Sequence, residues 1–120
     1  MTATKNNSGQ IINSTEDKQK GNVILEISCR VNGINKDQLL SCKDEASRDL
    51  RRQCFYLLQK NTNLSLNNIA SMFGMSRNSI KYGIETIQVH SKLYVDTLRS
   101  LRTIVNTANE KTCNMFELKF

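Results

Sequence analysis

The stretch from Ser76 to Tyr82 reads SRNSIKY and gathers side chains that can recognise nucleic acid. Arginine can bond guanine bidentately and asparagine can do the same with adenine, while lysine, serine and tyrosine suit phosphates. If the stretch is helical, its outer face carries a single acid, Glu85. A helix face that is only solvated more often mixes charges of both signs. The pattern therefore favours the start of a helix that meets DNA.

The residues around this stretch predict two helices joined by a tight turn. Gly74 tolerates the positive φ that a sharp reversal requires, and Ser76 can cap the helix that follows. The small Ala70 lets the two helices cross closely, and Ile80 fills the angle between them. These are the packing demands of a helix-turn-helix. The same residue types also occur at ordinary helical corners, which is the structural alternative.

The remaining apolar spacings predict further helices. Of the 120 residues 38% are hydrophobic and 6% aromatic, and the chain has no proline. The first predicted elements are a helix over 23–31 ended by Asn32-Gly33, a helical turn over 34–40 capped by Asn35, and an amphipathic helix over 46–60. The two helices around the tight turn follow: one is capped by Ser65 and ended by Gly74, and the other begins at Ser76 and buries Ile80, Ile84 and Ile87. The last is a helix over 91–105 whose apolar ridge includes Leu93 and Leu98. The sequence thus predicts a compact all-α domain of about six helices that contains a helix-turn-helix.

The two ends of the chain differ in composition from this region. Residues 1–22 are rich in Asn, Thr, Ser, Gln, Lys and Gly, so we expect a disordered leader before a domain over 23–107. Residues 108–120 have no clear period and form a C-terminal tail. Its apolar residues can either dock on the domain or pair with another chain.

The charge balance suits an anionic partner, although solubility alone can also explain it. The formal net charge is +6 and the sequence pI is near 9.3. Counting Lys and Arg minus Asp and Glu, residues 61–107 give 5 − 2 = +3, the most basic stretch of the chain. The predicted helix-turn-helix therefore lies where phosphate would be attracted most.

The cysteines and the histidine predict neither a metal site nor catalysis. Cys29, Cys42, Cys54 and Cys113 match no zinc pattern, so reduced structural thiols are expected, and His90 has no cysteine beside it in sequence. No apolar run approaches the ~20 residues that span a bilayer. We expect a soluble cytoplasmic protein that is not an enzyme and uses no cofactor or metal.

From about Val23 to Ile104 the sequence resembles the C-terminal DNA-binding domain of the bacterial replication initiator DnaA. The matching stretches are INKDQLLS, RRQCFYLLQK and LSLNNIASMFG, in the family's order and with nearly its separations. The resemblance implies a Trp-repressor-like helical fold and binding to double-stranded DNA.

The resemblance also implies roles for particular residues. An arginine-glutamine pair that touches phosphate falls on Arg52 and Gln53, and a lysine near the end of the same helix falls on Lys60. The family's groove-reading signature aligns with residues 74–80, which are one residue shorter. The predicted base-reading residues are Arg77, Asn78 and Ser79, and the predicted phosphate-binding residues are Arg52, Gln53, Lys60, Lys81 and Tyr82.

Two departures from the family change what is expected. Asp44 stands where the family has an arginine that enters the minor groove, so this contact is expected to be lost. The altered groove-reading residues indicate a target other than the DnaA box. The five glycines also form no phosphate-cradling loop, so we expect no binding of ATP.

The leading prediction is therefore sequence-specific binding of double-stranded DNA by a stand-alone domain. Its role would lie in regulation of replication or transcription, or in a mobile element. The alternative is a protein-interaction module that keeps the fold without reading DNA. Asp44, Glu45 and Asp49 favour it, because they lie next to the basic flank of the helix over 46–60, formed by Arg48, Arg51, Arg52 and Lys60. A nuclease or other enzyme lacks any supporting group of residues.

Overall fold

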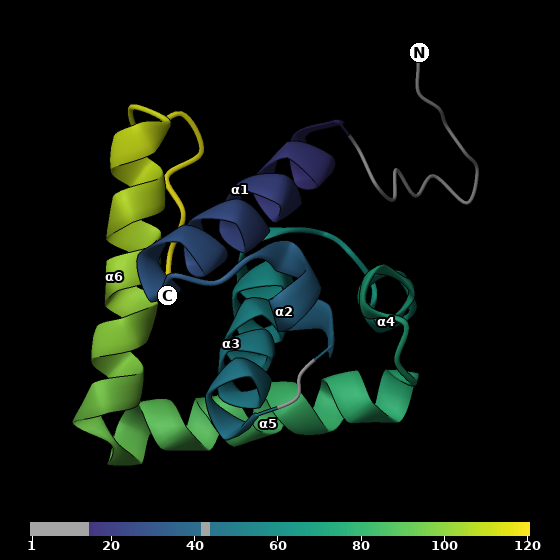
Figure 1. Cartoon of the computed structure of the whole chain (residues 1–120). Coiled ribbons are helices and arrows are strands. Elements are labelled where there is room, and N and C mark those ends of the chain that lie inside the picture. Colours follow the sequence, from purple (N-terminus) through teal and green to yellow (C-terminus); the bar gives the residue numbers. More distant parts are fainter. Residues whose placement is uncertain (1–14, 42–43) are drawn as a thin grey trace.

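The structure is a computed structural model that describes residues 15–41 and 44–120 (Figure 1). Within these ranges the chain is helical and contains no strand. The helices are α1 (Thr15–Asn32), α2 (Lys36–Ser41), α3 (Glu45–Asn61), α4 (Leu66–Phe73), α5 (Arg77–Leu93) and α6 (Val95–Lys111). The predicted all-α fold of about six helices is confirmed.

Helix α3 is the central element of the fold and contacts α1, α2, α4 and α5. Helix α5 runs across one side of α3, and α6 leaves the end of α5 to pack along α1 (Figure 1). All six helices contribute buried side chains to one core. At its centre the ring of Phe55, 1% exposed, meets the ring of Phe73 edge to face at 4.8 Å.

Short polar side chains fix where several of the helices begin. The predicted caps are confirmed: Asn35, Ser65 and Ser76 each accept a hydrogen bond from the backbone N–H three residues later. Helix α3 has a cap that the sequence did not reveal. The Asp44 carboxylate accepts from the Ser47 N–H at 2.7 Å, and this hydrogen bond holds the pKa of Asp44 below its usual value.

The first helix begins eight residues earlier than the sequence predicts. Residues 15–22 belong to α1, so the expected disordered leader is wrong for them, and residues 1–14 lie outside the described residues. The buried face here consists of Gly21, which packs against Leu58, and of Asp17, which accepts from the Asn63 N–H at 3.3 Å. Because neither residue is a large hydrophobe, the pattern of apolar residues did not predict this first part of the helix.

The boundary between the last two helices also differs from the prediction. Helix α5 continues to Leu93 and α6 spans Val95–Lys111, whereas the sequence predicted one helix over 91–105. Tyr94 breaks the helical path with φ −121° and ψ 118°. As a result Leu93, predicted to lie on the buried ridge, is 67% exposed.

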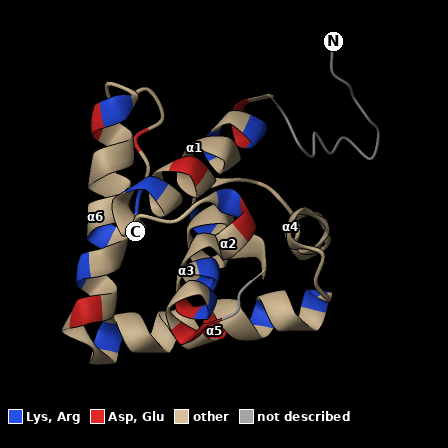
Figure 2. Ribbon diagram, in the orientation of Figure 1, with Lys and Arg blue, Asp and Glu red and all other residues tan. Residues whose placement is uncertain are grey.

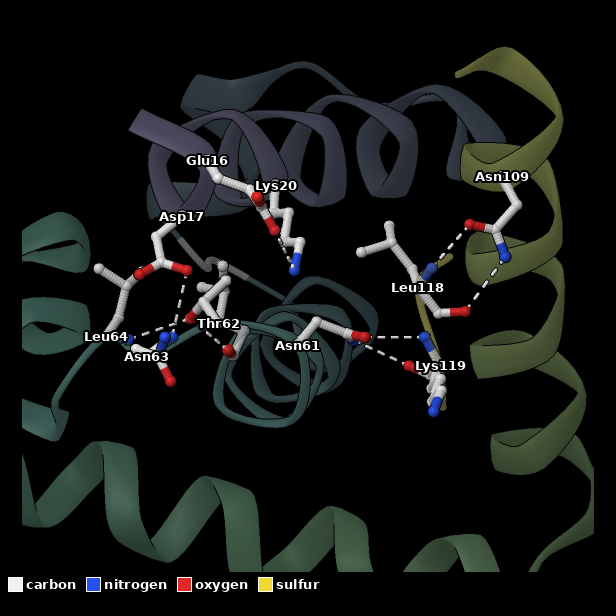
Figure 3. A network of polar contacts seen from close by, with 11 residues as sticks. Glu16, Asp17, Lys20, Asn61, Thr62, Asn63, Leu64, Asn109, Leu118 and Lys119 are labelled. Carbon is white, nitrogen blue, oxygen red and sulfur yellow. Dashed lines mark hydrogen bonds and ion pairs between the residues drawn. The ribbon is translucent and has the colours of Figure 1, made fainter. Parts of the chain in front are cut away.

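The C-terminal segment docks on the domain through two asparagines (Figure 3). Asn61 accepts from the Lys119 N–H at 2.7 Å and donates to the Lys119 carbonyl at 2.8 Å. Asn109 binds the N–H and carbonyl of Leu118 in the same way, at 2.9 and 3.1 Å. Leu118 is 4% exposed, so of the two predicted alternatives for the tail, docking on its own chain holds for this residue.

Candidate nucleic-acid interface

The turn between α4 and α5 sets the direction in which α5 starts. Gly74 has φ +63°, a left-handed conformation that glycine adopts without strain, and the Met75 N–H donates to the Ala70 carbonyl at 3.0 Å. Ser76 Oγ then accepts from the Ser79 N–H at 3.2 Å. Ala70 and Ile80, at 7% and 0% exposure, pack beneath the turn as predicted. The first turn of α5 is thereby held at the surface by local hydrogen bonds and by the core.

The first two turns of α5 present a polar face to solvent. Because successive residues are 100° apart around a helix, burial of Ile80 and Ile84 turns Asn78, Ser79 and Tyr82 outward. Arg77 lies on the same side of the helix as Ile84, seven residues later, and is exposed at the helix start. The exposed residues are Arg77, Asn78, Ser79, Lys81 and Tyr82. Tyr82 is 63% exposed, and the Ser79 hydroxyl accepts from Ser76 Oγ at 3.0 Å. All five predicted side chains on this helix are thus accessible to a ligand.

A groove of about 320 Å³ separates this face from α3. Its lining residues are Arg48, Arg51, Arg52, Phe55, Met75, Asn78, Ser79 and Tyr82. The charged residues of this lining are all arginines, so we call it the arginine groove. The α3 arginines follow one another at helical spacing, which places their charges along one edge of the predicted base-reading face. Figure 2 shows Lys and Arg on α3, with acidic residues at its start, and on the first half of α5.

All three arginines of the groove make contacts within the domain, Arg51 with α2 and the other two with the start of α3. Arg51 Nη1 donates to the Leu40 carbonyl at 2.9 Å, which anchors its guanidinium beside α2. Glu45 lies 3.3 Å from Arg48 and 3.9 Å from Arg52, measured between carboxylate oxygens and guanidinium nitrogens. The Glu45 side chain is 75% exposed, so solvent weakens both ion pairs. A phosphate could compete with Glu45 for these two guanidinium groups.

Gln53, predicted to bind phosphate, lies inside the protein. It is 3% exposed, its Nε2 donates to Asp49 at 2.8 Å, and its Oε1 accepts from Ser100 Oγ at 2.7 Å. Both ends of the amide are therefore occupied in a link between α3 and α6. The predicted phosphate contact of Gln53 is wrong, because the side chain cannot reach a bound ligand.

Lys60 lies away from the face formed by Arg77 and its neighbours. Its ammonium sits 5.8 Å from the centre of the Tyr56 ring, and it lines a hollow with the last turns of α5, including Gln88 and Lys92. Eight residues of α3 separate it from Arg52, about 12 Å along the helix. The structure groups Arg52 with the predicted base-reading residues and does not group Lys60 with them.

Arg48 and Arg51 were not assigned to the site from the sequence, although both line the groove. The signal for them was present: they lie on the predicted basic flank of the amphipathic helix, at positions i and i+3. What the sequence could not provide was the side of α3 that faces α5. The close approach of Arg52 Cγ to Gly83 sets that side, since a Cβ built on Gly83 would lie 3.2 Å from it.

The described residues offer no site for a metal. Within them, no group of three or more His, Cys, Asp and Glu residues is placed to hold an ion. Cys29 and Cys54 are buried free thiols and Cys113 is an exposed one, while Cys42 lies outside the described residues. Burial raises the pKa of Cys54 to about 12 and also raises the pKa of Cys29.

In residues 15–41 and 44–120, no helix is long and apolar enough to cross a membrane.

Comparison of the sequence with protein-family models and with curated proteins, and of the structure with solved structures, gives no match.

Proposed function

We propose that this chain binds double-stranded DNA with the start of α5 in the major groove and the α3 arginines on the phosphate backbone. One observation carries the proposal: the start of α5 exposes five polar residues, three of which, Asn78, Ser79 and Tyr82, line a groove whose charged lining is entirely arginine. Arg77, Asn78 and Ser79 would contact base edges. Arg48 and Arg52 would contact phosphates, together with Lys81 and Tyr82 from α5.

The shape of the face supports this mode of binding. The major groove is about 12 Å wide and admits one α-helix, whose N-terminal residues reach the base edges. The N-terminal turn of α5 also carries the positive end of the helix dipole, which favours phosphate nearby. Helix α4 and the Gly74 turn lie beside this end of α5 and could rest on the backbone.

The proposed DNA-binding domain resembles the C-terminal domain of DnaA in sequence. It would act in the cytoplasm of a bacterium, in regulation of replication or transcription, or in a mobile element. Asp44 caps α3 where the family has an arginine, so a minor-groove contact from this position is not part of the proposal. We therefore expect a target sequence other than the DnaA box.

A protein-interaction module is the second candidate function. The contacts of Glu45 with Arg48 and Arg52 favour it, because a carboxylate already pairs with two of the arginines that line the groove. An acidic segment of a partner protein could replace Glu45 there just as a phosphate could. Binding to duplex DNA separates the two candidates.

The proposal is tested by fluorescence polarisation with a random-sequence duplex and a DnaA-box duplex across a salt series. We expect binding at ~50 mM salt that weakens steeply as salt rises, because bound cations are released from the phosphates. Absence of binding to either duplex at ~50 mM salt would remove the DNA-binding proposal and leave the interaction module.

Two variants separate base contacts from phosphate contacts. Arg77→Ala should remove discrimination worth about 1 to 3 kcal/mol between the preferred and a random duplex. Arg52→Ala should weaken binding to both duplexes alike and lower the magnitude of the salt slope by about one. Arg30→Ala is the control, since it removes the same charge from the exposed surface of α1.

A further inference from the structure

The corner where α5 meets α6 exposes a continuous group of apolar side chains. Val89, Leu93, Tyr94 and Val95 are 53, 67, 54 and 65% exposed, and together they form what we call the apolar corner. The corner lies at the lower left of Figure 1, at the end of α5 remote from α4. Single exposed hydrophobes are ordinary, but adjacent ones on a water-facing surface mark a contact site.

The start of α6 differs from the other helix starts in a way that fits a covered surface. Asp44, Ser65 and Ser76 cap α3, α4 and α5 with side-chain oxygens, whereas Tyr94 at the start of α6 makes no side-chain cap. Exposed helix starts favour small polar residues because these satisfy the free N–H groups. The Tyr94 ring instead stands edge to face on His90, with ring centres 5.1 Å apart. The fold of a single chain gives no reason for apolar residues here.

The charges at the rim of the apolar corner indicate what covers it. Lys92 precedes Leu93 and Asp96 follows Val95, and both are exposed; Asp96 also pairs with Arg99 of its own chain at 3.4 Å. In a two-fold symmetric contact, residue i of one copy meets residue j of the other, and j meets i. Lys92 of each copy would then meet Asp96 of its partner, so the rim is complementary to itself. A polyanion would be repelled by Asp96 and would gain nothing from the apolar centre.

We propose that the apolar corner is the interface of a homodimer, formed by a second copy of this chain related by a two-fold axis. Helix α5 has 17 residues, about 25 Å of helix, so the corner lies at the opposite end from Arg77. Dimerisation therefore leaves the start of α5 and the arginine groove accessible in both copies. A stable interface buries about 800 Å² on each partner. Four side chains and their rim supply only part of this area, so the dimer is weak.

Sedimentation velocity of the full chain from ~10 μM to ~1 mM tests the proposal. The wild-type sedimentation coefficient should rise with concentration and fit a monomer–dimer equilibrium. Leu93→Asp should remain monomeric over the whole range, with helicity unchanged by circular dichroism because Leu93 is largely exposed. Met115→Asp is the control, since Met115 is 73% exposed on the C-terminal segment, and it should behave as wild type. A wild type that is monomeric at ~1 mM, or a Leu93→Asp protein that dimerises like it, would overturn the proposal.

A charge reversal tests the two-fold pairing itself. Asp96→Lys should weaken the dimer at least several-fold, because lysine would then face Lys92 of the other copy. Adding Lys92→Asp to that variant restores opposite charges and should recover the dimer. Arg99→Ala is the control for the internal ion pair of Asp96, 3.4 Å long, and should leave the dimer unchanged. Dimerisation of both single and double variants at equal, reduced strength would rule out this pairing. None of these outcomes depends on whether the chain binds DNA.

Discussion

Gly83 of α5 lies directly against the ring of Phe55 of α3. A Cβ atom built on Gly83 would be 2.9 Å from Phe55 Cδ2, closer than real Cβ contacts come. The absence of a side chain at this position therefore lets the two helices cross closely. The same crossing lays the stem of Arg52 against α5, so a packing requirement in the core brings the α3 arginines and the start of α5, the proposed DNA-contacting residues, to one surface.

Alanine substitutions at two helical glycines should change stability in opposite directions. Gly83→Ala places a methyl group into Phe55, and such overpacking costs about 1 to 3 kcal/mol, which outweighs a gain in helix propensity of about 1 kcal/mol. At Gly21 a Cβ would lie 3.4 Å from Leu58, an ordinary contact, so Gly21→Ala should gain the propensity term. Urea unfolding should give a lower midpoint for the first variant and a higher one for the second. A higher midpoint for both would mean that the α3–α5 crossing is looser than described.

The turn before α5 should tolerate only residues that accept a left-handed backbone. Gly74 has φ +63°, so Gly74→Val should lower the free energy of unfolding by more than ~1 kcal/mol through backbone strain. Gly74→Asn is the matched control and should cost less, because asparagine enters this region more readily. Equal thermal midpoints for wild type and the valine variant would show that the turn does not need this conformation.

The buried thiol of Cys54 should be unreactive in the folded protein. Burial raises its pKa to about 12, so at pH 8 only about one thiol in ten thousand is a thiolate. The unfolded thiol ionises from about pH 8.5. The stability that comes from keeping it neutral is therefore present below that pH and is lost as the pH rises towards 12. Iodoacetamide labelling at pH 8, followed by peptide mass spectrometry, should modify the exposed Cys113 first and Cys54 only in denaturant. Equal labelling rates without denaturant would contradict the burial of Cys54.

Removing the acid beside the arginine groove should strengthen DNA binding. Glu45 contacts Arg48 and Arg52 and would repel phosphate there, so Glu45→Gln should raise affinity for every duplex severalfold at ~50 mM salt, with less effect at high salt. Glu110→Gln makes the same charge change at the exposed end of α6 and serves as the control. If only an acidic peptide, and no duplex, gained affinity from Glu45→Gln, the interaction module would be favoured.

Local signals in the sequence predicted the local parts of the fold well. The caps Ser65 and Ser76 and the reversal at Gly74 each depend on one residue and its immediate neighbours, which a sequence displays directly. The start of α1 was missed because its buried face is made of Gly21 and Asp17, which no hydrophobic pattern reveals.

The candidate site was predictable only where exposure follows from helical spacing. Asn78 and Ser79 lie outward because Ile80 and Ile84 must lie inward, whereas Arg77 shares the side of Ile84 and is exposed as the first residue of the helix. The phosphate-binding residues depend on how α3 is rotated against α5 and α6, which is a tertiary property. That rotation buries Gln53 against Ser100, so its predicted phosphate contact failed, and it places Lys60 away from the α5 start.

The measurement that tests the central claim most directly is a titration of the ¹⁵N-labelled chain with a short duplex at ~50 mM salt, followed by amide chemical shifts. Binding through the proposed face should shift the amides of residues 76–82 and 48–52 most. The amides of residues 104–111 in α6 should stay unchanged and provide the internal control. Shifts absent altogether, or concentrated on α6 and the C-terminal segment, would contradict the assignment of α5 and the arginine groove as the DNA-binding surface.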